Sequence, residues 1–376
     1  MRLIAGLEDV LPLLGLVFVL AATLALVLTP LVRRLALRRG TVDLPNHRRV
    51  NVAPVPRGGG VAVAAAFLVV AAGAIVLNGA LNLVPVPFTL TPIELAALLA
   101  GGALAALLGV LDDAYQLRAR WQLGGQLLLS LIAVAGGITV TLINNPFGPG
   151  NIVLAGPFAA GFTVLWITGM INSINFIDGL DGLSSGIALI AAVTLGLISL
   201  TTAIGQPFVA LLCFALAGAL LGFLRWNFHP ASVFIGTSGV MFVGYTLAVL
   251  SILGSAKVAV ALLVLGVPII DTFWILVRRV ATGRSPFTPD RGHIHHRLLD
   301  LGMSHRQSVL LIYAICAGLA ALTFVLSGTG QVYAFLGLGV AFGLGLSVLT
   351  RGASGNALEA ETYEDAPGAE KPAGRR

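Results

Sequence analysis

The sequence is poor in charge: Asp, Glu, Lys and Arg together make up 10% of its 376 residues. Soluble domains usually carry about 25% charged residues, so this composition excludes an ordinary water-soluble domain. Hydrophobic residues account for 57% of the chain and the mean hydropathy is +0.97. Together these values indicate a polytopic membrane protein.

Cysteine is almost absent. Cys213 and Cys316 stand singly within apolar runs, without the spacing of a disulfide framework or of a metal site. We therefore expect no disulfide and interpret both residues as small buried hydrophobes.

Apolar runs recur along most of the chain, and about 20 apolar residues suffice to cross a bilayer. The candidate spans are residues 10–32, 59–78, 93–111, 124–143, 157–171, 186–204, 208–224, 239–254, 257–277, 307–327 and 332–350. The first run is too long and wrongly flanked for a cleavable signal peptide. The sequence thus predicts an all-α polytopic membrane protein with about eleven transmembrane helices, forming one integral domain over residues 1–350.

Positive charge falls on one side of this arrangement. When the spans alternate in direction, almost all Arg and Lys residues gather in one set of loops, and only Arg2 and Lys257 fall in the other. The positive-inside rule then places the N-terminus outside and the C-terminus in the cytoplasm. The net charge of +6 and the pI near 9.9 follow from these loops, so we expect a lipid bilayer and no nucleic acid as partner.

The composition also predicts the state of the C-terminal residues and the kind of organism that the protein comes from. Residues 351–376 are rich in Ala, Gly, Glu and Pro and predict a disordered cytoplasmic tail. Abundant Ala, Gly and Arg beside two Lys residues favours a bacterial protein of high genomic GC content, hence a multi-pass protein of the bacterial cell membrane.

The stretch NSINFIDGLDGLSSG, residues 172–186, sets two carboxamides and two carboxylates between apolar segments. Asn172 and Asn175 are three residues apart, as are Asp178 and Asp181, so one helical end can project all four side chains one way. Polar groups in such a setting are functional candidates by default, for a metal, a phosphate or a proton. The alternative is a polar loop that caps a helix beginning near Ser184.

A second acidic motif closes the third apolar run. Asp112 and Asp113 are adjacent carboxylates at a low-dielectric boundary, so either a cation must offset them or one must stay protonated. Arg118 and Arg120 are one source of that charge. Mg²⁺ is the preferred interpretation, because hard cations take oxygen ligands from one or two carboxylates while phosphates complete the shell.

Two basic loops accompany these acids. The segment DRGHIHHRLL packs His293, His295 and His296 beside Arg297, a set that fits a diphosphate better than zinc or a lipid surface. In the loop at residues 33–57, Asp43 and Asn46 are the candidates for substrate contact, and most of its arginines are assigned to topology.

All these polar groups fall at the predicted cytoplasmic helix ends. Such a site suits a reaction between a soluble phosphorylated donor and a lipid phosphate. A transporter is a competing class, although transporters usually place such groups near the bilayer midplane.

These motifs, in this order, resemble the polyprenyl-phosphate N-acetylhexosamine-1-phosphate transferases over roughly residues 40 to 310. The matching stretches are VDLPNHRRVNVAPVPRGGG, the Asp112–Asp113 pair, NSINFIDGLDGL, VFIGTSG and PFTPDRGHIHHRLLDLG. The HIHH form and the span count resemble the GlcNAc-type branch of that family.

The resemblance implies Mg²⁺-dependent transfer of a sugar 1-phosphate from a UDP-N-acetylhexosamine to polyprenyl phosphate, with Mn²⁺ as an alternative ion. The products are UMP and a polyprenyl-diphosphate-sugar, the first membrane intermediate of a cell-envelope glycan. Whether the enzyme forms a homodimer is left open. The catalytic residues implied are Asp112, Asp113, Asp178 and Asp181; the metal ligands are Asn175 and Asp113; the substrate-binding residues are Asp43, Asn46, Asn172, His293, His295, His296 and Arg297.

The chain departs from the family pattern at one important place. Family members usually carry a metal-binding Asp in a Gly-Asp-x-Gly-Ser element, where this chain has Thr237, a neutral and weak ligand. Either another carboxylate such as Asp271 substitutes, or metal binding is weaker, or the protein is an altered member that only binds its ligands. Asp271 has the alternative of pairing with an Arg in helix packing. A smaller departure is Asn51, where relatives often have His.

Overall fold

The structure, a computed structural model, describes residues 7–43, 54–81, 90–148, 150–201, 204–253, 257–283, 285, 292–326 and 328–345. Asn46, Asn51 and the predicted disordered tail at 351–376 lie outside these residues.

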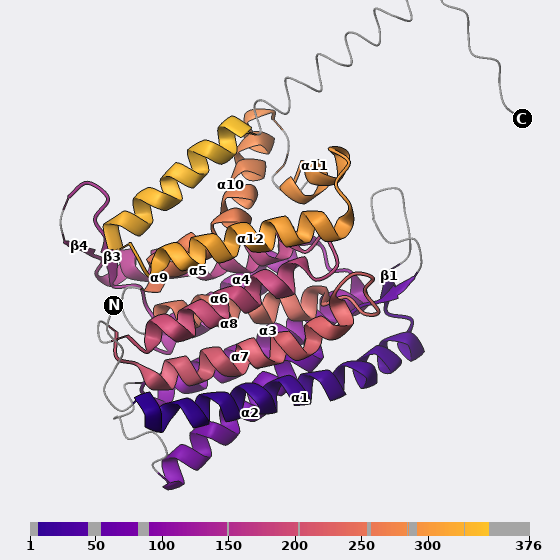
Figure 1. The fold of residues 1–376 in the computed structure, drawn as a ribbon, viewed down its shortest axis with the longest axis horizontal. Coiled ribbons are helices and arrows are strands. Elements are labelled where there is room, and N and C mark those ends of the chain that lie inside the picture. The colour runs from indigo at the N-terminus through magenta and orange to yellow at the C-terminus, as the bar shows by residue number, and fades with distance from the viewer. Residues whose placement is uncertain are drawn as a thin grey trace, which may run out of the picture.

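The described chain is mostly helical, which confirms the all-α prediction. The main helices are α1 (Leu7–Arg39), α2 (Gly60–Leu81), α3 (Pro92–Tyr115), α4 (Ala119–Ala135), α5 (Gly156–Ile177), α6 (Leu183–Ser199), α7 (Pro207–Asn227), α8 (Gly236–Ile252), α9 (Lys257–Val264), α10 (Gly266–Ala281), α11 (Ile294–Asp300) and α12 (His305–Thr323). Residues 328–345 are also helical. Most of the long helices run side by side (Figure 1).

Six helices of the described chain are long and apolar enough to cross a membrane, or seven if the bent pair α9–α10 counts as one span. The helices α6 and α8 are apolar but shorter, at 17 residues each. The protein is thus a polytopic membrane protein, whereas the eleven-span count and the orientation of the termini stay predictions.

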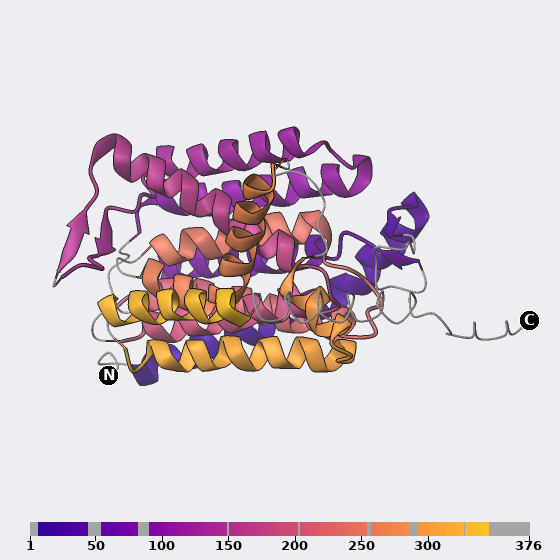
Figure 2. The same cartoon turned by 90° about the horizontal axis from the view of Figure 1, so that it is seen from above.

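Two predicted spans differ from the observed helices. The run at 257–277 is broken near Leu265, where its two helical parts meet at 78°, and α10 crosses the direction of the other helices (Figure 2). The run at 124–143 contains only α4, because Gly136 and Gly137 end the helix, the latter with a φ of +85°. Strand β3 (Leu142–Asn144) follows and forms a hairpin with the antiparallel strand β4 (Asn151–Val153).

The core of the bundle is formed by α6, α7 and α8, whose residues are mostly fully buried. Helix α7 packs against α1 at backbone distance: a Cβ on Gly218 would lie 2.1 Å from the carbonyl oxygen of Phe18, and one on Gly222 would lie 2.0 Å from that of Ala22. Small residues permit such close helix contacts in membranes. Cys213 is buried in this core, Cys316 is buried as well, and the two residues form no disulfide.

Candidate functional site

The predicted site residues that the structure describes lie at the end of the bundle that carries β1 and α11, opposite the hairpin of β3 and β4 (Figure 1). This end gathers the last turns of α3 and α5 and the first turn of α8. The sequence motifs therefore meet although long stretches of chain separate them.

The carboxylate of Asp113 binds the first turn of α8. Its Oδ1 accepts a hydrogen bond from the backbone N–H of Thr237 at 2.8 Å, and its Oδ2 accepts one from Ser238 at 3.0 Å. The N-terminus of a helix offers free N–H groups and partial positive charge, both of which stabilise an anion. Asp113 thus joins the end of α3 to the start of α8.

Asp112 is fixed by neighbouring groups as well. Its Oδ1 accepts from the backbone N–H of Leu117 at 3.0 Å and from Nε2 of Gln122 at 2.7 Å. Its Oδ2 accepts from the hydroxyl of Thr237 at 2.6 Å. Thr237, the residue that departs from the family pattern, therefore joins the acidic pair as a hydrogen-bond donor.

Arg118 and Arg120 do not neutralise this acidic pair. The side chains of Arg118 and Arg120 are exposed, and Arg120 lies over the ring of Trp121 at 5.7 Å. The helix terminus and the polar donors stabilise the pair, and the pairing with Arg118 and Arg120 that the sequence suggested is wrong.

Glycines allow the backbones to meet around Asp113. Gly236 has a φ of +69°, and a Cβ there would lie 2.7 Å from Oδ2 of Asp113. On the adjacent segment, Gly59 and Gly60 donate their N–H groups to the carbonyl oxygens of Phe234 and Ile235 at 2.9 and 2.8 Å. The RGGG motif thus docks α2 on the turn that precedes α8.

Arg57 is a site residue that the sequence interpretation missed. Strands β1 (Val42–Asp43) and β2 (Val55–Pro56) pair antiparallel, and Nη2 of Arg57 lies 2.8 Å from Oδ1 of Asp43. Arg57 and Asp113 line one cavity of about 440 Å³ together with residues from the end of α1 and the end of α3. Its place directly before the close-approach glycines was the available signal.

Asp178 lies in the turn after α5 and accepts a hydrogen bond from the hydroxyl of Ser184 at 2.5 Å. Burial raises the pKa of Asp178 to about 7; the Ser184 hydroxyl and the charge of Arg57 act in the opposite direction, while Asp113 and Asp181 add to the increase. These carboxylates are therefore electrostatically coupled.

The two asparagines of the motif differ in their surroundings. Nδ2 of Asn172 donates to Oε1 of Gln126 at 2.6 Å and to the carbonyl oxygen of Thr168 at 2.8 Å, so Asn172 joins α5 to α4. The carboxamide of Asn175 makes no hydrogen bond with any described residue. Asn175 is the one of the two with free ligand atoms near Asp178.

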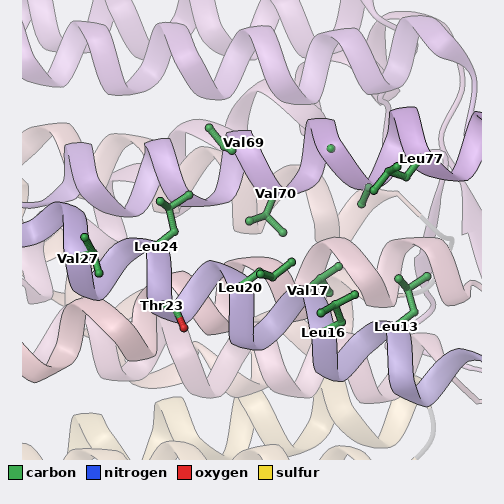
Figure 3. Close-up of a pocket in the computed structure, with 12 residues that line it drawn as sticks. Leu13, Leu16, Val17, Leu20, Thr23, Leu24, Val27, Val69, Val70 and Leu77 are labelled. Carbon is green, nitrogen blue, oxygen red and sulfur yellow. The ribbon is translucent and has the colours of Figure 1, made fainter.

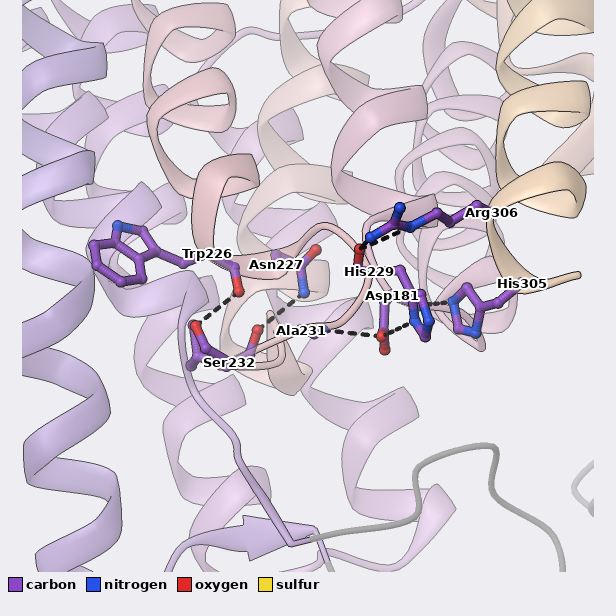
Figure 4. Close-up of polar contacts among 9 residues, drawn as sticks. Asp181, Trp226, Asn227, His229, Ala231, Ser232, His305 and Arg306 are labelled. Carbon is purple, nitrogen blue, oxygen red and sulfur yellow. Dashed lines mark hydrogen bonds and ion pairs between the residues drawn. The ribbon is translucent and has the colours of Figure 1, made fainter.

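Asp181 forms a compact group with two histidines that the sequence interpretation did not select (Figure 4). Its Oδ2 lies 2.7 Å from Nδ1 of His229, and its backbone N–H donates to Nε2 of His305 at 2.8 Å. Single histidines in turn sequences such as NFHPA carry no spacing signal, so only the fold shows this group.

The segment that carries His293, His295 and His296, called the histidine loop below, contacts α10. Nδ1 of His293 lies 2.7 Å from Oδ2 of Asp271, and the backbone N–H of Ile294 donates to Oδ1 at 3.0 Å. Asp271 is 1% exposed. Because the loop engages both of its oxygens, Asp271 holds the start of α11.

The three histidines of the loop are not equivalent. His295 is 1% exposed and packs on Gly179, where a Cβ would lie 2.0 Å from Nε2 of His295. Burial, followed by the nearby charges of His296, His293 and His305, lowers the pKa of His295 well below 6.5, so its ring is neutral. His296 and Arg297 are partly exposed.

A second cavity, of about 460 Å³, lies between α1 and α2 and is lined almost wholly by apolar side chains (Figure 3). Leu16, Leu20 and Val27 line its α1 side, and Val69 and Leu77 line its α2 side. Such an apolar lining favours contact with hydrocarbon over contact with water.

Residues 95–255 match the model of glycosyl transferase family 4. The chain is 37% identical over 304 residues to a probable undecaprenyl-phosphate N-acetylglucosaminyl 1-phosphate transferase of Bacillus subtilis, covering 79% of this chain and 80% of the relative. It is 36% identical to the decaprenyl-phosphate N-acetylglucosaminephosphotransferase of Mycolicibacterium smegmatis, with 80% and 79% covered. It is 29% identical to the undecaprenyl-phosphate alpha-N-acetylglucosaminyl 1-phosphate transferase of Yersinia pestis, with 77% of each covered.

Proposed function

Because this chain belongs to the polyprenyl-phosphate N-acetylhexosamine-1-phosphate transferases of glycosyl transferase family 4, we propose that it transfers N-acetylglucosamine 1-phosphate from UDP-N-acetylglucosamine to undecaprenyl phosphate. An oxygen of the lipid phosphate attacks the β-phosphorus of the donor. The bond from that phosphorus to the bridging oxygen breaks, and UMP leaves with that oxygen.

The observation that carries this proposal is the convergence of Asp112 and Asp113 with the first turn of α8 and the cavity of Arg57. A cationic side chain beside fixed carboxylates suits two phosphate groups that must meet at one place. A transporter is not favoured, because this group lies at one end of the bundle.

We propose Mg²⁺ as the cofactor, with Mn²⁺ as an alternative that accepts the same oxygen ligands. The donor set fits a hard cation: Asp113 and Asp178 are coupled carboxylates, and Asn175 has a carboxamide without a hydrogen-bond partner in the described chain. Asp113 and Asn175 would hold the ion, and Thr237 offers a hydroxyl in place of the usual carboxylate. When bound, the ion offsets the charge of the phosphates.

The chain's own residues divide the remaining work. A lipid phosphate monoester is largely ionised near neutral pH, with a second pKa of about 6, so Asp112, Asp178 and Asp181 orient groups more than they remove a proton. Arg57 binds phosphate beside Asp43. His293, His296 and Arg297 bind the donor diphosphate, while His295 is the packing residue that sets them against the Asp178 turn.

The membrane arrangement forms part of the same proposal. Eleven spans, with the N-terminus outside, would place this site at the cytoplasmic face of the bacterial cell membrane, where nucleotide sugars are available. The cavity between α1 and α2 fits a hydrocarbon chain of the bilayer.

The test is UMP release by the purified full-length protein in lipid nanodiscs, with Mg²⁺, undecaprenyl phosphate and a panel of UDP-sugars. We expect release with UDP-N-acetylglucosamine and its loss in Asp112→Asn and Asp113→Asn. Arg120→Gln, an exposed arginine at the same end of the bundle, is the matched control and should retain activity. A well-folded protein that releases no UMP from any UDP-hexosamine would refute the proposal.

A further inference from the structure

Asp181 has one carboxylate oxygen that is fully engaged and one that is not. Oδ2 accepts hydrogen bonds from Nδ1 of His229 at 2.7 Å and from the backbone N–H of Ala231 at 3.0 Å (Figure 4). Oδ1 has no hydrogen-bond partner among the residues that the structure describes. An oxygen left in this way is what a carboxylate needs in order to act on a ligand while its rotamer stays fixed.

The main chain of Asp181 is held by a second histidine. Its N–H donates to Nε2 of His305 at 2.8 Å, so Nε2 must carry a lone pair and the proton of His305 must sit on Nδ1. That Nδ1 is buried and has no partner. Leaving a buried N–H without a hydrogen bond is unfavourable. The position of the ring is nevertheless the one that holds the main chain of Asp181.

The two histidines come from separate elements and support each other. His229 follows α7, and His305 is the first residue of α12. Their rings stack with centroids 4.1 Å apart at 20°, and Arg306 donates to the carbonyl oxygen of His229 from Nε at 3.3 Å and from Nη2 at 3.1 Å. The turn that carries Asp181 is thereby connected to both neighbouring helices.

We propose that His229 and His305 are positioning residues that hold Asp181 for the transfer reaction, His229 as a donor to the carboxylate and His305 as an acceptor from the main chain. This inference rests on the proposed function. A transition-metal site is the competing interpretation, since ligand atoms of Asp181, His229 and His305 lie within 4.8 Å of one another. We favour positioning because the two ring nitrogens are already engaged in hydrogen bonds with Asp181.

The test exploits the direction of each hydrogen bond. His305→Gln retains an acceptor oxygen near the position of Nε2, whereas His305→Arg offers only donors. His229→Asn retains a donor near Nδ1, whereas His229→Asp places a carboxylate against Asp181. Ser232→Ala is the matched control: Ser232 lies in the same loop as His229, but its hydroxyl donates to the carbonyl oxygen of Trp226 on α7 and does not contact Asp181.

We expect the acceptor variant of His305 and the donor variant of His229 to keep kcat within about tenfold of wild type, and their opposites to lose at least about a hundredfold in kcat, with little change in KM. A loss of this kind indicates that the interaction positioned by the two histidines, that of Asp181, is made in the transition state. Equal effects of Gln and Arg at position 305, accompanied by equal losses of melting temperature, would overturn the inference in favour of simple packing.

Hydrogen exchange of the peptide that contains residues 178–182 gives a readout independent of activity. The Asp181 amide should exchange faster in His305→Arg than in wild type, with protection recovered in His305→Gln. Unchanged protection in His305→Arg would refute the contact itself. Inhibition by micromolar Zn²⁺ that disappears in His305→Gln without loss of kcat would favour the metal site. A wild type that releases no UMP but shows the expected exchange pattern would refute the function and leave the contact intact.

Discussion

The carboxylate of Asp271 lies 2.7 Å from Nδ1 of His293 and joins α10 to the first histidine of the histidine loop. Its other oxygen accepts from the backbone N–H of Ile294, the first residue of α11. A carboxylate in this position sets which ring nitrogen of His293 carries the proton and leaves Nε2 for a ligand. The orientation of a proposed diphosphate-binding group is therefore decided from a neighbouring helix.

Asp271→Asn should lower kcat/KM for UDP-N-acetylglucosamine by about 10- to 100-fold, since a hydrogen bond to a charged group contributes about 1.5–3 kcal/mol. Thr272→Ala is the control, because Thr272 is the next buried residue of α10 and its hydroxyl has no partner. In a background of His293→Gln, Asp271→Asn should cost little more. Full additivity of the two losses would contradict the pairing.

Gly179→Ala should destabilise the protein and impair turnover, because the new Cβ would lie 2.0 Å from Nε2 of His295. Overpacking of this kind typically costs about 1–3 kcal/mol. Gly161→Ala on α5 is the matched control, since no atom lies within 4 Å of its Cβ position and alanine favours the helix. Melting temperatures of both variants, measured in the same detergent, check the prediction. Equal melting temperatures would show that the ring of His295 can move aside without loss of stability and would contradict the prediction.

Thr237→Asp should make stability dependent on divalent cations. The substitution removes a 2.6 Å hydrogen bond to Asp112 and adds a third carboxylate to the acidic pair. We expect a lower melting temperature in EDTA and recovery with Mg²⁺, with a larger Mg²⁺-induced shift than in wild type. Thr237→Ser retains the hydroxyl and should behave as wild type does. A variant that is stable in EDTA would contradict the close approach of the three side chains.

Arg57→Gln should raise the KM for undecaprenyl phosphate by about 10- to 100-fold, the range expected when a charge-assisted contact to phosphate is lost. It also removes an ion-pair partner of Asp43. Arg39→Gln is an informative comparison, because Arg39 lines the same cavity without a described ion pair to Asp43. An unchanged KM in Arg57→Gln would exclude the cavity as the phosphate site.

Asp178→Asn should gain stability relative to wild type as the pH rises. The pKa of Asp178 is raised from 3.8 to about 7, first by burial, so the folded protein binds a proton that the unfolded chain has released across this interval. The contribution of the wild-type carboxyl is present below pH 4 and is lost as the pH rises through about 7. Melting temperatures without added metal, at pH 5 and pH 8, check the sign. A constant difference between the two proteins would contradict the shift.

Local sequence chemistry identified the acidic and histidine motifs, because carboxylates and glycines stand out in an apolar chain. It could not identify the groups that stabilise these carboxylates in the folded protein. The partner of Asp113 is the backbone of residues 237 and 238, and backbone groups leave no mark on composition. Arg57 was assigned to topology with the other arginines of its loop, although its place directly before three glycines distinguishes it from them.

The break between α9 and α10 was hidden for a related reason. Residues 257–277 are apolar on both sides of Leu265, and hydropathy measures the transfer of side chains to lipid without measuring direction. Asn172 is a further example: its spacing matches that of the site residues, yet Gln126 on α4 takes its carboxamide. Periodicity predicts which side chains share one face of a helix, but the partners of those side chains depend on the neighbouring helix.

The attachment of Asp113 to α8 also has a consequence for biogenesis. The carboxylate and its donor at Ser238 are 125 residues apart in the chain, so α3 is synthesised and inserted long before its partner exists. During that interval Asp113 lacks its donors on α8 and is solvated by water, which holds the end of α3 at the membrane surface. Arrival of α8 then replaces water by fixed N–H donors, and the acidic pair becomes ordered only after most of the bundle has been inserted.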